Sequence, residues 1–164
     1  YFVKNAKEHP AHIEKQLYFF TEQLKIANQF HLPVILHVRN AIDDVLKYLR
    51  KAKVNGGIAH AFNGSFQQAE QLIALGFKLG FGGAMTYSRA LHIQALAKQL
   101  PLEAIVLETD SPDIPPEWLG KQARNTPAQT VKIAQFLADL RQVNVSQVLD
   151  ITSANALQIL PKLA

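Results

Sequence analysis

Apolar residues recur along the chain in two alternating patterns, one with helical spacing and one of short continuous runs. After Pro10, apolar side chains at three- and four-residue spacing predict an amphipathic helix that ends near His31. The run PVILHVR (33–39) that follows is short, rich in β-branched residues and bounded by proline, which is typical of a strand covered on both faces. A helix followed by a strand therefore opens the chain.

The same alternation continues through the rest of the sequence. Further strands are predicted at 56–62, 76–83 and 103–110, and further helices at 41–51, 65–75, 89–100 and 127–140, with short helical pieces over 146–160. Ser65 and Thr126 are candidate helix N-caps, because their hydroxyls can accept hydrogen bonds from the free amides of a first turn. The expected order is one helix and then four strand–helix units, in a single domain over residues 1–164.

This order predicts an α/β fold with a parallel sheet and helices packed on it. Two architectures are compatible with it: an open doubly wound sheet, and about half of a (β/α)8 barrel, which usually needs about 250 residues. The chain has 164 residues. No GxGxxG fingerprint follows the first predicted strand, so the open nucleotide-binding architecture lacks its best support. Polar residues at the strand ends favour the barrel.

Three of the four predicted strands end in side chains that can bind a metal. These are His37, His60 and Asp110, and Glu108 lies two residues before Asp110, on the same face if the strand alternates regularly. A flat sheet would hold these groups apart, whereas inward-facing side chains of a barrel converge near its axis. Two imidazoles and a carboxylate suit a divalent ion. For each histidine alone, a hydrogen-bonded core position is the alternative.

Two arginines and two aromatic residues lie near the predicted site. Arg39 follows the first candidate ligand by two residues and could bind a phosphate through its planar guanidinium, or form a salt bridge with Glu108 or Asp43. Arg124 precedes the last long predicted helix and could face phosphate or solvent. Trp118 and Phe62 could stack on nucleic-acid bases or pack against the protein.

Composition narrows the chemistry further. The chain has no cysteine, which excludes disulfides, thiolate metal ligands and cysteine nucleophiles. Its 17 Lys and Arg against 13 Asp and Glu give a net charge of +4, which weakly favours an anionic partner such as nucleic acid. No apolar run approaches the roughly 20 residues that span a bilayer, and the first residues lack the order of a signal peptide. We expect a cytoplasmic protein with no membrane partner.

Five motifs follow one another along the chain: LPVILHVR, GIAHAFNGS, GFGGAMTY, VLETDSPD and RNTP. With these motifs at this spacing, nearly the whole chain resembles the TatD family of metal-dependent deoxyribonucleases. The resemblance implies a TIM-like (β/α)8 barrel, one or two divalent ions (magnesium, manganese or zinc) and hydrolysis of DNA phosphodiester bonds.

The resemblance also implies roles for individual residues. His37, His60 and Asp110 match metal-binding positions of the family, and Glu108 matches the glutamate of its ETD motif, for which we expect a ligand-orienting role. Asp110 is also the candidate catalytic residue, because a carboxylate at that place can accept a proton from the attacking water.

The family's HxH motif on the first barrel strand and its glutamate on the fourth are absent, so the chain resembles strands five to eight. We therefore expect weak metal binding and little nuclease activity from an isolated half-barrel. Its exposed sheet edges should favour self-association or pairing with an amino-terminal half. Two other functions stay open: a metal-dependent hydrolase of an ester or amide such as an aminoacyl-tRNA, and a non-catalytic fragment or binding module.

Overall fold

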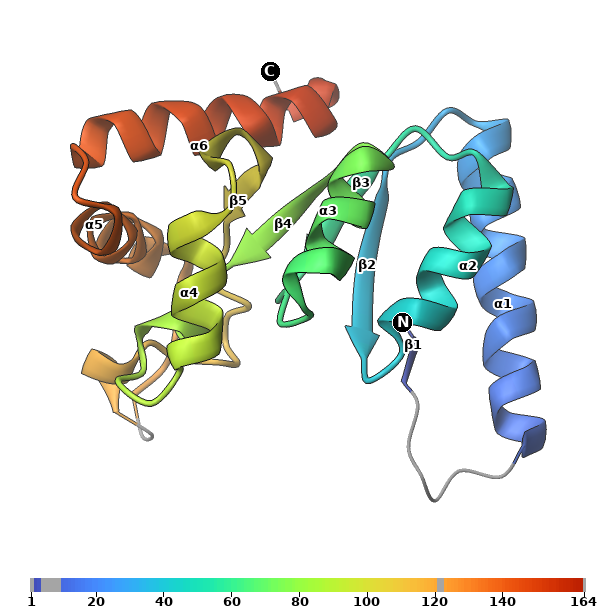
Figure 1. The fold of residues 1–164 in the computed structure, drawn as a ribbon, viewed down its shortest axis with the longest axis horizontal. Coiled ribbons are helices and arrows are strands. Elements are labelled where there is room, and N and C mark those ends of the chain that lie inside the picture. The colour runs from blue at the N-terminus through green and yellow to red at the C-terminus, as the bar shows by residue number, and fades with distance from the viewer. Residues whose placement is uncertain (1, 4–9, 121–122, 164) are drawn as a thin grey trace.

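A computed structural model of the chain describes residues 2–3, 10–120 and 123–163. It contains one parallel sheet in which strands that are consecutive in sequence are also neighbours in space, in the order β1-β2-β3-β4-β5 (Figure 1). Its strands are β1 (Phe2–Val3), β2 (Val34–Arg39), β3 (Gly57–His60), β4 (Phe77–Phe81) and β5 (Ile105–Leu107). This sequential winding is that of a (β/α)8 barrel, because the strand order of a doubly wound sheet reverses at a switch point.

The four predicted strands are confirmed, and β1 is an addition to them. β1 has two residues and pairs in parallel with the end of β2, where Phe2 is opposite Val38 and Val3 is opposite Arg39. A segment this short has no periodicity of its own, so the sequence pattern could not reveal it. The fold is thus a TIM-barrel-like α/β arrangement.

The helices alternate with the strands as predicted. They are α1 (Pro10–Gln29), α2 (Ile42–Ala52), α3 (Phe66–Ala74), α4 (Leu91–Gln99), α5 (Thr130–Arg141) and α6 (Val145–Ile159). Short 3-10 turns occur at Gly83–Thr86, Leu102–Ala104, Glu117–Leu119, Pro127–Gln129 and Pro161–Leu163. No helix in the described part of the chain is long and apolar enough to cross a membrane.

The short helical pieces predicted over 146–160 are in fact the single helix α6. Asn144 caps its start, because its Oδ1 accepts a hydrogen bond from the Ser146 amide at 2.8 Å. Thr152 and Asn155 interrupt the apolar pattern and yet are buried, since Thr152 donates to the Val148 carbonyl and Asn155 donates to two carbonyls beside β5. Polar side chains whose hydrogen bonds are satisfied can occupy a core, which a pattern of apolar residues does not anticipate.

The prediction that Thr126 caps a helix at 127 is also corrected. Residues 127–129 form a 3-10 turn with Pro127 at its start, and α5 begins only at Thr130. The Thr126 side chain makes no capping hydrogen bond. A single tight turn therefore separates the loop from the helix.

The two faces of the sheet are covered unequally. The outer face packs on the helices through a continuous core that includes Leu36, Leu79 and Ile105. On the inner face, Ile159 of α6 packs against Ile58 and Val106, and α6 runs across the ends where β4 and β5 begin (Figure 1). Ile35 of β2 points to the same inner side and is 62% exposed, so the expectation that this strand is covered on both faces is wrong.

Ser65 is the N-cap of α3, as predicted. It forms a capping box with Gln68, in which the Ser65 hydroxyl accepts from the Gln68 amide at 3.2 Å and the Gln68 side chain accepts from the Ser65 amide at 2.9 Å. Such a box satisfies two amides that the helix itself leaves unpaired.

The substitution Ser65→Ala should lower the free energy of unfolding by about 1 kcal/mol, because the Gln68 amide loses its acceptor. Urea denaturation followed by circular dichroism measures the change. Ser153→Ala, at an exposed position inside α6, is the matched control and should cause no loss, since alanine has the higher helix propensity. An equal loss in both variants would contradict the capping role.

Candidate metal centre

Two histidines lie side by side at the carboxyl ends of β2 and β3. His37 and His60 are opposite each other in the parallel register, so both side chains point to the inner face. Their ring centroids are 5.5 Å apart, with the rings tilted by 31°. Partial burial lowers the pKa of His37, and the neighbouring His60 lowers it further. His37 is thereby kept in the neutral form that can bind a metal.

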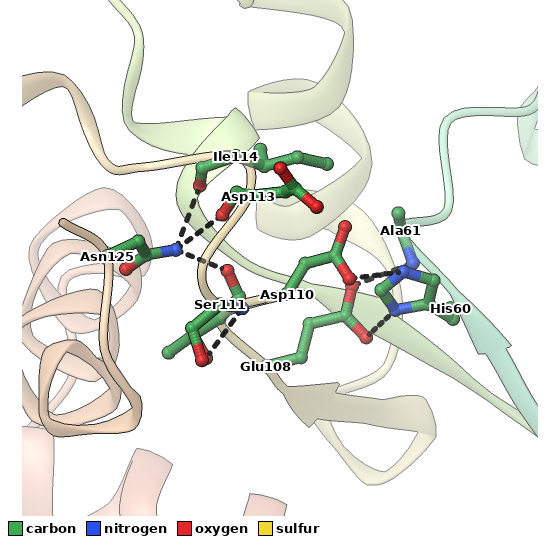
Figure 2. Close-up of polar contacts among 9 residues, drawn as sticks. His60, Ala61, Glu108, Asp110, Ser111, Asp113, Ile114 and Asn125 are labelled. Atoms are coloured by element: carbon green, nitrogen blue, oxygen red, sulfur yellow. Dashed lines mark hydrogen bonds and ion pairs between the residues drawn. The ribbon is translucent and has the colours of Figure 1, made fainter. Parts of the chain in front are cut away.

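Two carboxylates hold the His60 ring, one at each nitrogen (Figure 2). Its Nδ1 is 2.9 Å from Glu108 Oε2, and its Nε2 is 3.2 Å from Asp110 Oδ1. The other oxygen of Glu108 accepts a hydrogen bond from the Ala61 amide at 2.7 Å. The ring is therefore fixed in orientation, with Nε2 directed at Asp110.

These contacts also set the protonation of His60. The hydrogen bond that His60 donates to Glu108 raises the pKa of His60, partial burial opposes that rise, and the charges of Glu108 and Asp110 add to it. The side chain of His60 is 16% exposed. In protonated His60 the Nδ1 proton faces Glu108 and the Nε2 proton faces Asp110, and a metal ion at Nε2 would have to replace the second of these protons.

Asp110 reaches the site, but not through the regular strand alternation that predicted it. β5 ends at Leu107, Glu108 continues the pairing through its amide to the Phe81 carbonyl at 3.1 Å, and Asp110 then has a left-handed backbone with φ of 52°. The chain turns at this residue, which brings its carboxylate next to β3. The predicted neighbourhood of Glu108 and Asp110 is correct, whereas the predicted backbone is not.

A second left-handed residue decides the position of Phe62. Ala61 has φ of 47°, so the chain turns after His60 and Phe62 no longer shares the face of that histidine. The Phe62 ring is instead buried in the main core, in edge-to-face contact with Phe81. Of the two roles weighed for Phe62, packing is the one that the structure has, and stacking on bases is wrong.

The sequence pattern did not predict a role for two glycines, Gly80 in β4 and Gly82 just after it. A Cβ atom at residue 80 would overlap the Glu108 carboxylate, and one at residue 82 would lie 2.7 Å from the Glu108 carbonyl oxygen. These positions must lack a side chain for Glu108 to cross β4 and reach His60. A glycine inside a strand is the signal that could have shown this close approach.

The two candidate phosphate-binding arginines lie on the surface of the molecule. Arg39 and Arg124 are both exposed. The carboxylates considered as salt-bridge partners of Arg39 are otherwise engaged, since Asp43 accepts from the Gln68 side chain at 2.8 Å and Glu108 binds His60 and the Ala61 amide. Trp118 is 41% exposed and donates to the Gln129 side chain.

The nitrogen and oxygen donors of these side chains are of the types that bind divalent ions, and the structure brings the side chains together in pairs. Imidazole nitrogens and a carboxylate oxygen are ligands of zinc, manganese and related ions. His60 and Asp110 are in direct contact, and His37 is the neighbour of His60 on the next strand. Within the described ranges, no three His, Asp or Glu side chains stand close enough to hold one ion as they are.

A cavity of about 110 Å³ opens beside these residues. Its polar lining residues are Asn63, Glu108, Thr109 and Asp110, and glycines and apolar residues form the remaining wall. The site therefore has room for small groups next to the carboxylates.

The pKa of His60 predicts a pH dependence of stability. A raised folded-state pKa stabilises the fold below the unfolded value of about 6.5, and this contribution is lost as the pH rises through the folded value. In the presence of a chelator, His60→Asn should therefore cost more unfolding free energy at about pH 5.5 than at about pH 8.5. Urea denaturation at both values measures it. In a Glu108→Gln background the difference should shrink, and an unchanged difference would contradict the pairing.

Comparison with known proteins shows which family the chain belongs to. A family model described as TatD related DNase matches residues 3–161. An uncharacterized metal-dependent hydrolase of Haemophilus influenzae is 40% identical over 147 residues, which cover 88% of this chain and 55% of the relative. The human protein named deoxyribonuclease TATDN3 is 33% identical over 150 residues, 92% of this chain and 53% of its own length. The chain spans about half the length of these curated relatives.

A solved structure agrees as well. The crystal structure of YjjV, a TatD homologue from Escherichia coli K12, superposes with a TM-score of 0.86 at 33% identity, over 97% of this chain and 61% of that one. The match extends through the whole sheet and its helices, so it confirms the TIM-barrel-like fold. The chain belongs to the TatD related DNase family of metal-dependent hydrolases.

Proposed function

We propose that this chain supplies part of a metal-dependent site that hydrolyses DNA phosphodiester bonds. His37, His60 and Asp110 would hold one or two divalent ions, which could be magnesium, manganese or zinc. The observation that carries the proposal is the His60 ring, whose Nδ1 is held by Glu108 at 2.9 Å while Nε2 faces Asp110 at 3.2 Å. A histidine fixed by a carboxylate at one nitrogen is typical of a metal ligand that binds through the other.

Each residue of the proposed site would have a separate role. Glu108 would keep the proton of His60 on Nδ1, so that the lone pair of Nε2 stays available. Asp110 would bind the ion and accept a proton from the attacking water. A bound divalent ion would supply Lewis acidity, lowering the pKa of water and stabilising charge on the phosphate oxygens. Arg39 and Arg124, both exposed, would bind flanking phosphates through their guanidinium groups.

Three observations support DNA as the substrate. The matching family model is described as a DNase, and the human relative is named a deoxyribonuclease. The net charge of +4 also suits a polyanion. An ester or amide such as an aminoacyl-tRNA would use the same ligands and is therefore a competing substrate in the test, and a non-catalytic binding module is the remaining alternative.

We expect the 164-residue chain to cleave single-stranded DNA slowly with magnesium or manganese, and Asp110→Asn to lower that rate at least about tenfold, since the variant loses a charged ligand and proton acceptor. Cleavage of a labelled oligonucleotide measures the rate, and calorimetry measures manganese binding. Asp139→Asn, on the surface of α5, is the control. Unchanged manganese binding by Asp110→Asn would contradict the site. Turnover equal to that of a full-length relative would contradict the expected loss of activity, and cleavage of an ester without DNA cleavage would favour the alternative substrate.

We infer further that the inner face and the outer strands are covered in the working protein by barrel elements that this chain does not supply. Ile35 is 62% exposed on the inner face, and β1 and β5 are the outer strands of the sheet. Unpaired strand edges and exposed apolar side chains favour association.

The isolated chain should therefore self-associate, so that its weight-average mass rises with concentration in sedimentation velocity. Ile35→Lys should weaken the association, because it places a charge on the exposed inner face. Ile26→Lys, at an exposed position on α1, is the matched control and should weaken it less. A monomer at all concentrations would contradict the inference.

A further inference from the structure

The segment after β5 carries Asp110 on a backbone that contains two left-handed residues. Asp110 has φ of 52°, and Ile114 has φ of 44°. Residues other than glycine rarely adopt such conformations, and a β-branched isoleucine is a marked outlier there. Conformations of this kind persist only where surrounding groups hold them in place.

One buried side chain makes those contacts. Asn125, which is 1% exposed, donates through Nδ2 to the carbonyls of Thr109 at 2.7 Å, of Asp113 at 2.6 Å and of Ile114 at 3.4 Å (Figure 2). The Thr109 carbonyl belongs to the peptide that enters Asp110, and the other two carbonyls lie on either side of the Ile114 backbone. A single amide therefore binds next to both left-handed residues.

The orientation of this amide follows from its neighbours. If the amide were flipped, its oxygen would face three carbonyl oxygens, so Nδ2 must face them. Oδ1 of Asn125 is then buried without a hydrogen-bond partner among the described residues, which opposes folding. A side chain that leaves its acceptor unsatisfied contributes chiefly through its two donor hydrogens.

Other contacts hold the far end of the same segment. Tyr87 donates through its hydroxyl to the Pro115 carbonyl at 3.0 Å, and the Glu117 amide donates to the Thr86 hydroxyl at 2.8 Å. These contacts fix residues 115–117 against the loop that follows β4. Asn125 acts on residues 109–114, which carry the Asp110 carboxylate.

We propose that Asn125 is a positioning residue, whose amide holds the strained backbone of residues 109–114 and so directs the Asp110 carboxylate at His60 Nε2. The inference rests on the proposed function only where it takes Asp110 to be a metal ligand. Without the donors of Asn125, the left-handed residues relax and the 3.2 Å contact between Asp110 and His60 is lost, while the sheet and its helices remain.

The substitution Asn125→Asp tests this, because aspartate has nearly the same shape and no amide donors. In the metal-free chain, NMR should show the nuclear Overhauser contact between the His60 ring and the Asp110 β-protons disappearing, and the amide order parameters of residues 110–114 falling below those of rigid backbone. If Asn125→Asp does not fold, the milder Asn125→Ser decides by the same two measurements.

Asn155→Asp is the matched control. Asn155 is also buried, and its amide donates to the carbonyls of Leu102 at 2.9 Å and Ile105 at 2.7 Å, at the entry to β5 rather than at its exit. This variant should lose a similar amount of stability in urea and keep the contact between His60 and Asp110. Retention of the contact in Asn125→Asp, or its equal loss in both variants, would overturn the proposal.

A second substitution tests the strain itself. Asparagine tolerates the left-handed conformation better than isoleucine does. Ile114→Asn in the Asn125→Asp background should therefore restore part of the order of residues 110–114. A failure to restore it would overturn the role of strain. None of these measurements involves DNA or metal, so their outcome is separate from that of the proposed nuclease activity.

Discussion

The reach of Glu108 across β4 is the constraint on which the carboxyl edge of the sheet depends. Glu108 follows β5, whereas its partners His60 and Ala61 belong to β3 and the turn after it, so the Glu108 side chain must cross β4 to reach them. It can do so because Gly80 and Gly82 present no side chain between them. Once Glu108 is in place, the orientation of His60 is fixed, with Nε2 facing Asp110.

Sequence patterns predicted the elements well because the outer face of the sheet is a conventional core. Residues such as Leu36, Leu79 and Ile105 alternate with inward-facing positions, and the helices between them have clear apolar faces. The patterns failed where burial and polarity do not coincide. Asn155 is polar and buried, Ile35 is apolar and exposed, and a rule that equates apolar with buried misplaces both.

The candidate ligands were predictable from their places at the strand ends, but the way in which they meet was not. Period-two alternation holds only within a strand, and the left-handed residues Ala61 and Asp110 end it just where the site begins. The sequence did not predict the role of Asn125 for a related reason. That role depends on hydrogen bonds to backbone carbonyls 11 to 16 residues away, and every residue has such a carbonyl, so the sequence cannot indicate which ones are bound. The resemblance to a family supplied the expected metal-binding roles of His37, His60 and Asp110, which the local patterns left open.

The packing contacts of α6 and the candidate metal centre lie at opposite ends of the strands. The helix lies across the ends where β4 and β5 begin, with Ile159 against Ile58 and Val106, whereas the histidines and carboxylates lie at the opposite ends of the strands. Substitutions in α6 should therefore change the stability of the folded chain without touching the side chains of His60 and Asp110. During evolution, the stability of a relative could therefore be adjusted in α6, while a new substrate was acquired at the carboxyl ends of the strands.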